Sequence, residues 1–235
     1  MKHLAFLRGA AALSMAAVAS KLLGAVYRIA LTSLLGAAGM GLYQMAWPFF
    51  ALFLTLTSAG ASSSVSRLVA RERALGGSGN NVFLAGVRLF ALLGGAGAVL
   101  LALLARSIAR LQGADLAGGY FLLAPAVLLG GVLSAFRGYF LGVRRMAPAA
   151  LSEVLETLIK VGLGVFFALL FRSDPPRAAV LALSAVVLSE GAALAFLALS
   201  MKGERKTPDL KPRRSGEILP FVLPVMAAAC ILPLS

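Results

Sequence analysis

The sequence predicts an all-α fold, a polytopic membrane helix bundle. Of the 235 residues, 60% are hydrophobic and only 13% are charged, and the mean hydropathy is +0.92. The apolar residues gather in runs long enough to cross a bilayer. The 22 Lys and Arg residues, which give a net charge of +13, are spread over the short polar gaps between those runs. This pattern excludes a soluble globule, a disordered chain and a nucleic-acid-binding protein.

The membrane spans follow from length. A helix that crosses about 30 Å of hydrocarbon at about 1.5 Å per residue needs about 20 largely apolar residues. Six such windows are complete and a seventh begins near the end of the chain. In order, they are Ala10–Leu35, Leu42–Leu68, Val82–Ala105, Tyr120–Val143, Ala149–Phe171, Ala178–Ser200 and Ile218–Ser235.

A break in composition justifies the end of each window. The breaks are, in order, Gly36–Gly41, Val69–Asn81, Arg106–Gly119, Arg144–Pro148, Arg172–Arg177 and Met201–Glu217. The first is rich in glycine, the next two combine glycine with arginine, and the last three contain proline and basic residues, all of which interrupt apolar helices. We therefore expect a six-helix transmembrane lobe over residues 1–200, a basic cytoplasmic linker over 201–217, and the start of a seventh helix over 218–235.

The distribution of basic residues predicts a cytoplasmic N-terminus. With that orientation the cytoplasmic side carries Lys2, Arg8, Arg67, Arg71, Arg73, Arg88, Arg144, Arg145, Lys202, Arg205, Lys206, Lys211, Arg213 and Arg214. The opposite side carries Arg106, Arg110, Arg172 and Arg177. Cytoplasmic loops carry the excess of Lys and Arg in membrane proteins. Tyr43, Trp47 and Tyr120 then fall near the outer interface, where aromatic rings are enriched.

Both ends of the chain raise an alternative. Lys2, Arg8 and the small residues Ala17-Val18-Ala19 resemble a secretory signal, but the apolar run continues to Leu35, so we expect a retained first span. Ile218–Ser235 stops without a hydrophilic cap, and we expect the chain to be part of a longer transporter.

Ionisable side chains inside the spans are the candidate functional residues, because a charge near the bilayer centre is costly and is kept for binding, transport or pairing. Lys21 and Arg28 lie seven residues apart on one face of the first span. Their structural alternative is that Arg28 reaches the headgroups through its long stem.

The fifth and sixth spans carry the other candidates. Glu153, Glu156 and Lys160 share one helix face, with Glu156 placed to pair with Lys160. Glu190 needs a partner, for which Lys21 or Lys160 is the candidate. A purely structural ion pair is the alternative to a role in cavity lining or ion coupling. Arg137 is expected to reach lipid phosphate at the inner end of its span.

Residues needed for other chemistry are missing from the sequence. One cysteine, Cys230, and one histidine, His3, cannot supply four zinc ligands. No Walker sequence and no acid–base cluster at a membrane face occur. We therefore predict that the chain is not an enzyme and has neither a cofactor nor a metal.

Several short motifs resemble one known group of membrane proteins. They are Ser20-Lys21-Leu22-Leu23-Gly24, Leu34-Leu35-Gly36, Gly41-Leu42-Tyr43-Gln44 with Pro48, Ser66-Arg67-Leu68-Val69-Ala70, Phe136-Arg137-Gly138-Tyr139-Phe140 and Met146-Ala147-Pro148. In order and spacing they resemble the stage V sporulation protein B group. That group belongs to the polysaccharide-transport branch of the multidrug/oligosaccharidyl-lipid/polysaccharide (MOP) flippase superfamily, related to MurJ-type lipid II flippases. The resemblance covers the whole chain as the N-terminal half of a full-length member.

The resemblance implies a multi-pass cytoplasmic-membrane protein of about fourteen helices in two lobes, which works by alternating access. It implies that Lys21 and Arg28 attract the pyrophosphate of an undecaprenyl-linked sugar. The predicted function is a flippase for a lipid-linked oligosaccharide or peptidoglycan precursor in cell-wall or spore-cortex synthesis, with membrane lipids, the second lobe and synthesis enzymes as partners. The alternatives are a drug or cation exporter of the same fold, a membrane scaffold whose docking segment is Lys202–Arg214, and an inactive fragment.

Overall fold

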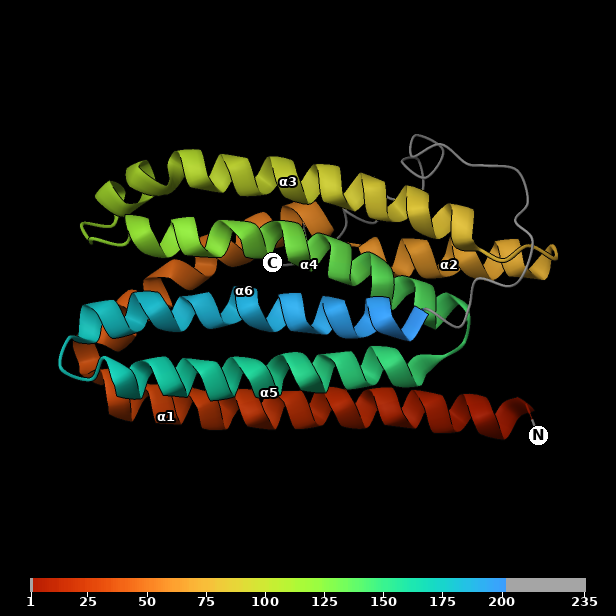
Figure 1. Ribbon diagram of the computed structural model, residues 1–235, viewed down its shortest axis with the longest axis horizontal. Coiled ribbons are helices and arrows are strands. Elements are labelled where there is room, and N and C mark those ends of the chain that lie inside the picture. The colour runs from red at the N-terminus through yellow and green to blue at the C-terminus, as the bar shows by residue number, and fades with distance from the viewer. Residues whose placement is uncertain (1, 202–235) are drawn as a thin grey trace, which may run out of the picture.

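The protein is a bundle of long helices in the computed structural model, which describes residues 2–201 and their side chains from residue 11 onward. The predicted seventh span, Cys230 and all but the first residue of the predicted linker lie outside the described residues. The helices are α1 (Lys2–Ser58), α2 (Ala61–Ala74), α3 (Asn80–Leu111), α4 (Ala117–Gly142), α5 (Met146–Leu170) and α6 (Pro175–Ser200). They lie side by side along the long axis of the molecule (Figure 1).

The helix α1 contains a reversal at Gly36. This residue has φ 62° and ψ −172°, a backbone conformation that glycine reaches at little cost, and it joins two helical arms. Figure 1 shows the first arm running from the N-terminus to one end of the bundle and the second arm returning. The predicted break Gly36–Gly41 is therefore wrong in extent, because helical structure resumes immediately after Gly36.

A second interruption divides the predicted window Leu42–Leu68. Ser58 ends α1, and Gly60, at φ 74°, precedes α2, which carries the chain onward in the same general direction (Figure 1). The sequence places a Gly- and Ser-rich stretch there, and such residues bend helices. In α4, by contrast, Pro125 and the pair Gly130-Gly131 lie within one continuous helix.

Four helical stretches are long and apolar enough to cross a membrane: Ala11–Ala74, Asn80–Leu111, Ala117–Gly142 and Pro175–Ser200. The first has 64 residues and turns back at Gly36, which leaves length for two crossings. The helix α5 carries Glu153, Glu156 and Lys160 within its 25 residues. The exact number of crossings and the cytoplasmic N-terminus stay predictions.

Two hydrophobic clusters hold the described helices together. One lies toward the Gly36 end and contains the fully buried Leu31, Phe50, Leu101, Tyr120 and Leu183. The other joins α2 to α3, α4 and α6 through side chains such as Val65, Phe90, Phe140 and Leu197. Large apolar side chains also remain exposed on the outer faces, as on a surface that contacts lipid.

Small residues allow α2 and α4 to approach closely. A Cβ atom added to Gly138 would lie 2.6 Å from the Ser62 carbonyl oxygen, and one added to Gly142 would lie 2.8 Å from that of Ser66. Gly138 and Gly142, four residues apart, therefore form a packing face between α4 and α2.

Candidate functional site

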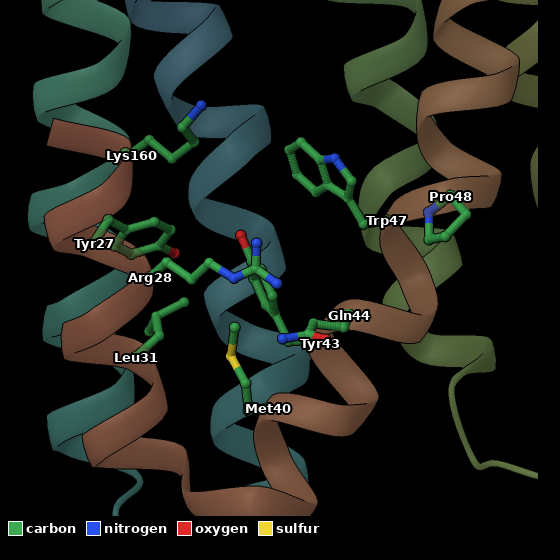
Figure 2. Close-up of a pocket in the computed structure, with 10 residues that line it drawn as sticks. Tyr27, Arg28, Leu31, Met40, Tyr43, Gln44, Trp47, Pro48 and Lys160 are labelled. Atoms are coloured by element: carbon green, nitrogen blue, oxygen red, sulfur yellow. The ribbon is translucent and has the colours of Figure 1, made fainter. Parts of the chain in front are cut away.

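A cavity of about 350 Å³ lies between the two arms of α1 and α5. Its wall is formed by Gly24, Tyr27, Arg28, Leu31, Met40, Tyr43, Gln44, Trp47, Pro48 and Lys160. Figure 2 shows Arg28 reaching from the first arm across this space toward Tyr43 and Gln44 on the second arm, with Lys160 and Trp47 beside it. The reversal at Gly36 is what brings the two arms together here.

Equal distances from the Gly36 reversal explain why these residues meet. Arg28 lies eight residues before Gly36 and Gln44 lies eight residues after it, so at 1.5 Å per residue each is about 12 Å from the turn. Lys160 lies ten residues before Leu170, the last residue of α5, or about 15 Å from that end. The three side chains therefore occupy one layer of the bundle.

The first arm of α1, which precedes Gly36, is amphipathic. Met15, Val18, Leu22, Val26 and Ile29 are 57% to 72% exposed and form one stripe. At about 100° per residue, Lys21 and Arg28 lie together on a side turned about 100° from the middle of that stripe. Both are exposed. Lys21 continues the Arg28 side about 10 Å deeper than Arg28, although it does not line the cavity.

Cations dominate the polar groups of the cavity. Within residues 11–201, neither Arg28 nor Lys160 forms a salt bridge or a side-chain hydrogen bond. The predicted pair of Glu156 with Lys160 is wrong, because Glu156 bonds to another helix. The cavity therefore presents two cationic side chains that form no salt bridge within the described residues.

Aromatic rings form the remaining wall. The Tyr43 and Trp47 rings are stacked, with centroids 6.4 Å apart and 20° between their planes. The edge of Tyr27 meets Tyr43 at 80°, and Trp47 also contacts Phe50 at 5.6 Å. Tyr43 and Tyr120 are buried inside the bundle, and Trp47 is 40% exposed. Their expected level near the outer interface stays a prediction.

A separate ionic cluster joins α4, α5 and α6. The guanidinium of Arg137 donates to Glu156 Oε2 at 2.7 Å and to Ser152 Oγ at 3.0 Å. The prediction that Arg137 reaches lipid phosphate is therefore wrong, because the side chain points into the bundle toward α5. Glu153, the third acidic candidate of the sequence, is half-buried and forms no ion pair within the described chain.

Glu190 brings α6 into this cluster. The residue is 5% exposed, and Oε2 has no hydrogen-bond partner within the described part of the chain. Its carboxylate lies against Gly130, where an added Cβ would be 3.5 Å from Oε1. The charged groups that act on it are Glu156, Lys160 and Arg137. Lys21 and Lys160 are the predicted partners of Glu190. Lys160 lies near Glu190 but forms no salt bridge with it, and no contact of Lys21 with Glu190 is found within the described residues.

Sequence reasoning missed the aromatic wall and Gln44 as site residues. Tyr43, Gln44 and Trp47 belong to motifs noted for their resemblance or for an interfacial location, and their spacing does place them on one turn of helix. The missing information was the contact between the two arms of α1, which the hydropathy pattern does not contain.

Comparison with known proteins decides the family. Residues 6–235 match the family described as polysaccharide biosynthesis protein. The chain belongs to this family. Stage V sporulation protein B of Bacillus subtilis (strain 168) is 34% identical over 162 residues, which are 67% of this chain and 31% of that protein. Lipid II flippase MurJ of the same organism is 28% identical over 167 residues, or 66% of this chain and 31% of that protein.

Solved structures give the fold. A MOP superfamily transporter from Pyrococcus furiosus superimposes with a TM-score of 0.73 at 20% identity, over 97% of this chain and 52% of that one. An outward-facing multidrug resistance transporter of the MATE family gives 0.70 at 20% identity, over the same shares. The chain thus spans about a third of the curated relatives it matches and about half of these transporters. It is a multi-pass cell-membrane protein with the fold of one part of a MOP transporter.

Proposed function

We propose that this protein acts in a membrane flippase that moves a lipid-linked oligosaccharide or peptidoglycan precursor across the cytoplasmic membrane for cell-wall or spore-cortex synthesis. The observation that carries the proposal is the cavity lined by Arg28 and Lys160, neither of which forms a salt bridge within the described residues. The relatives include a lipid II flippase and a sporulation protein of the same family. Such a precursor carries a pyrophosphate, which is the kind of group that unpaired cations attract.

The cationic side chains of the site can bind phosphate in two ways. The planar guanidinium of Arg28 offers a bidentate fork to phosphate, whereas Lys160 and Lys21 act as point charges. Lys21 lies deeper on the same side of α1, so it prolongs the positive surface along the path of the headgroup. A wall of this sign repels cationic drugs, which favours an anionic lipid over the alternative of a drug exporter.

We assign ion coupling to the cluster formed by Arg137, Glu156 and Glu190. Lys160 lines the cavity and also acts on the buried Glu190 carboxylate, so a change of charge on one side reaches the other. We propose that Glu156 holds Arg137 in place while the lobe changes orientation, that Glu190 interacts with Lys160 at longer range, and that Glu153 takes part in the same ion coupling. The second lobe of the transporter would close the path from the other side.

The decisive experiment measures binding of farnesyl pyrophosphate to the purified chain in lipid nanodiscs by calorimetry. Arg28→Gln and Lys160→Gln are each expected to weaken binding by about tenfold to a hundredfold, since each removes a charge-assisted hydrogen bond of about 1.5–3 kcal/mol. Lys21→Ala is expected to have a smaller effect. Arg88→Gln, an exposed change on α3, is the matched control and should leave affinity unaltered. Equal affinity in all four variants would remove the cavity from substrate binding.

The coupling role needs a transport measurement. In cells that express the transporter, Glu190→Gln is expected to slow flipping of a fluorescently labelled lipid-linked sugar, while the purified chain still binds farnesyl pyrophosphate. Flipping at the parental rate would exclude Glu190 from coupling, and lost binding would show that it belongs to the substrate site instead.

A further inference from the structure

We infer that Trp47 is a sugar-stacking platform, on which the first sugar of the lipid-linked substrate rests while Arg28 holds its pyrophosphate. This inference rests on the proposed function and deepens it. It names a residue that selects lipids carrying a sugar over the same lipid without one.

The Trp47 ring is held rigidly and still has open surface. Stacking on Tyr43 covers one part of the indole, and Phe50 supports it from the next turn of α1. The residue remains 40% exposed, and Figure 2 shows its ring directed into the space that Arg28 and Lys160 also enter. A ligand therefore meets a prearranged flat surface, so little ordering of the side chain is needed on binding.

The contacts of Trp47 differ from those of an isolated interfacial anchor. Tryptophan is common in membrane proteins at headgroup level. Trp47 lies eleven residues after Gly36, where it lines the cavity and packs against Tyr43 and Phe50. Its indole N–H has no hydrogen-bond partner within residues 11–201. A ligand in the cavity can therefore supply an acceptor for this donor.

The surrounding groups match a pyranose joined to a phosphate. One face of a pyranose ring is formed by C–H groups, which carry slight positive charge and pack against the negative face of an aromatic ring. Hydroxyl groups at the rim of the sugar need both donors and acceptors, and the amide of Gln44 offers both. Arg28 lies opposite Gln44 in the same layer, where it can hold the adjoining phosphate. Apolar, amide and cationic groups that match the parts of this headgroup thus line one cavity.

The test compares two probes that differ only by the sugar: farnesyl pyrophosphate, and farnesyl pyrophosphate esterified with one glucose. The purified chain in nanodiscs is titrated with each by calorimetry. The parental protein is expected to bind the sugar-bearing probe about fivefold more tightly, which corresponds to one aromatic stacking contact. Because Trp47 is the sole tryptophan of the sequence, its fluorescence reports on this site, and only the sugar-bearing probe should shift the emission.

Variants separate stacking from other roles. Trp47→Leu is expected to abolish the fivefold preference and leave farnesyl pyrophosphate affinity within twofold, whereas Trp47→Tyr should keep most of the preference. Phe121→Leu removes an exposed aromatic ring of α4 and is the matched control with unchanged preference. Circular dichroism establishes that each variant is folded.

Two results would overturn the inference while the proposed function stands. The first is an unchanged preference in Trp47→Leu. The second is an equal loss for both probes, which would mean that the indole packs against the prenyl chain. A different result, no loss of either affinity in Arg28→Gln, would count against the proposed function and not specifically against Trp47.

Discussion

Arg137 and Glu156 show how partner choice decides the role of a charge inside a membrane protein. Their side chains are 23% and 19% exposed, and the bond between them links α4 to α5. The sequence correctly marks Glu156 as a residue that needs a partner, because an isolated charge at that depth is costly. It assigns the wrong partner, since helical spacing favours Lys160 on the same helix while the contact between helices supplies Arg137.

The first prediction follows from this pair. Glu156→Gln should lower the free energy of unfolding by about 2 kcal/mol, because a charge-assisted hydrogen bond is lost and the guanidinium stays half-buried without its counter-ion. Unfolding of the purified chain in mixed micelles, followed by circular dichroism, measures it. The double variant Arg137→Gln with Glu156→Gln should recover part of the loss.

The exposed pair of Arg177 with Asp174 provides the control for this measurement. Its arginine side chain is 78% exposed, so Arg177→Gln should change stability by no more than about 0.5 kcal/mol. A loss in Glu156→Gln no larger than that of Arg177→Gln would show that the bond between α4 and α5 contributes nothing beyond a surface contact.

At the scale of the elements, the reversal of α1 depends on a single residue. The sequence predicts a break near Gly36 from composition, and its location is correct because glycine alone tolerates a backbone with φ 62° and ψ −172° at low cost. The close approach of Arg28 to Gln44 could not be predicted, because composition gives the place of a turn and not the rotation of the two arms about their axes.

A second prediction isolates the backbone of this turn. Gly36 and Gly41 both have open space where a Cβ atom would be added, but only Gly36 has positive φ. Gly36→Ala should therefore destabilise the fold by about 1–3 kcal/mol and weaken farnesyl pyrophosphate binding, since the cavity lies between the arms. Gly41→Ala, which is helical, should be neutral or slightly stabilising. Equal behaviour of the two variants in thermal unfolding would show that the turn accepts an ordinary residue.

Packing of α2 against α4 gives the third prediction. The added Cβ atoms in Gly138→Ala and Gly142→Ala would meet backbone oxygens of Ser62 and Ser66, which can yield only if the helices separate. Each change should cost about 1–3 kcal/mol. Gly95→Ala on α3 meets nothing within 4 Å and serves as the control. The ranking is checked by the midpoint of thermal unfolding, and a lower midpoint for Gly95→Ala than for Gly138→Ala would contradict the close approach.

For the whole molecule, hydropathy predicts the fold well because the bilayer imposes one length on every span. The windows from Val82 to Ser200 each correspond to one helix of α3 to α6, with ends that differ by several residues. Hydropathy does not predict the cavity. It is made by residues from both arms of α1 and from α5, whose separation along the chain carries no periodic signal.

The orientation of the whole molecule provides the fourth prediction. Figure 1 shows that the chain reverses between successive long helices, so Ala74 and Ala147 lie toward one end of the bundle and Leu111 and Ser173 toward the other. The first end carries Arg67, Arg71, Arg73, Arg144 and Arg145, and the second carries Arg106, Arg110, Arg172 and Arg177. The helix α6 ends at the first end, and the sequence that follows it is rich in Lys and Arg, so the positive-inside rule predicts that this end faces the cytoplasm.

Single cysteines test this orientation directly, since Cys230 is the sole native cysteine and Cys230→Ser removes it. In that background, cysteines are introduced one at a time at Ala74, Ala147, Leu111 and Ser173, all of which are exposed. A membrane-impermeant maleimide added to intact cells should label the changes at Leu111 and Ser173 within minutes and reach those at Ala74 and Ala147 only after the membrane is opened. The reverse pattern would place the N-terminus outside, and it would turn the Arg28 cavity, about 12 Å from the Gly36 turn, toward the opposite leaflet. Labelling of all four in intact cells would contradict a membrane-spanning arrangement of these helices.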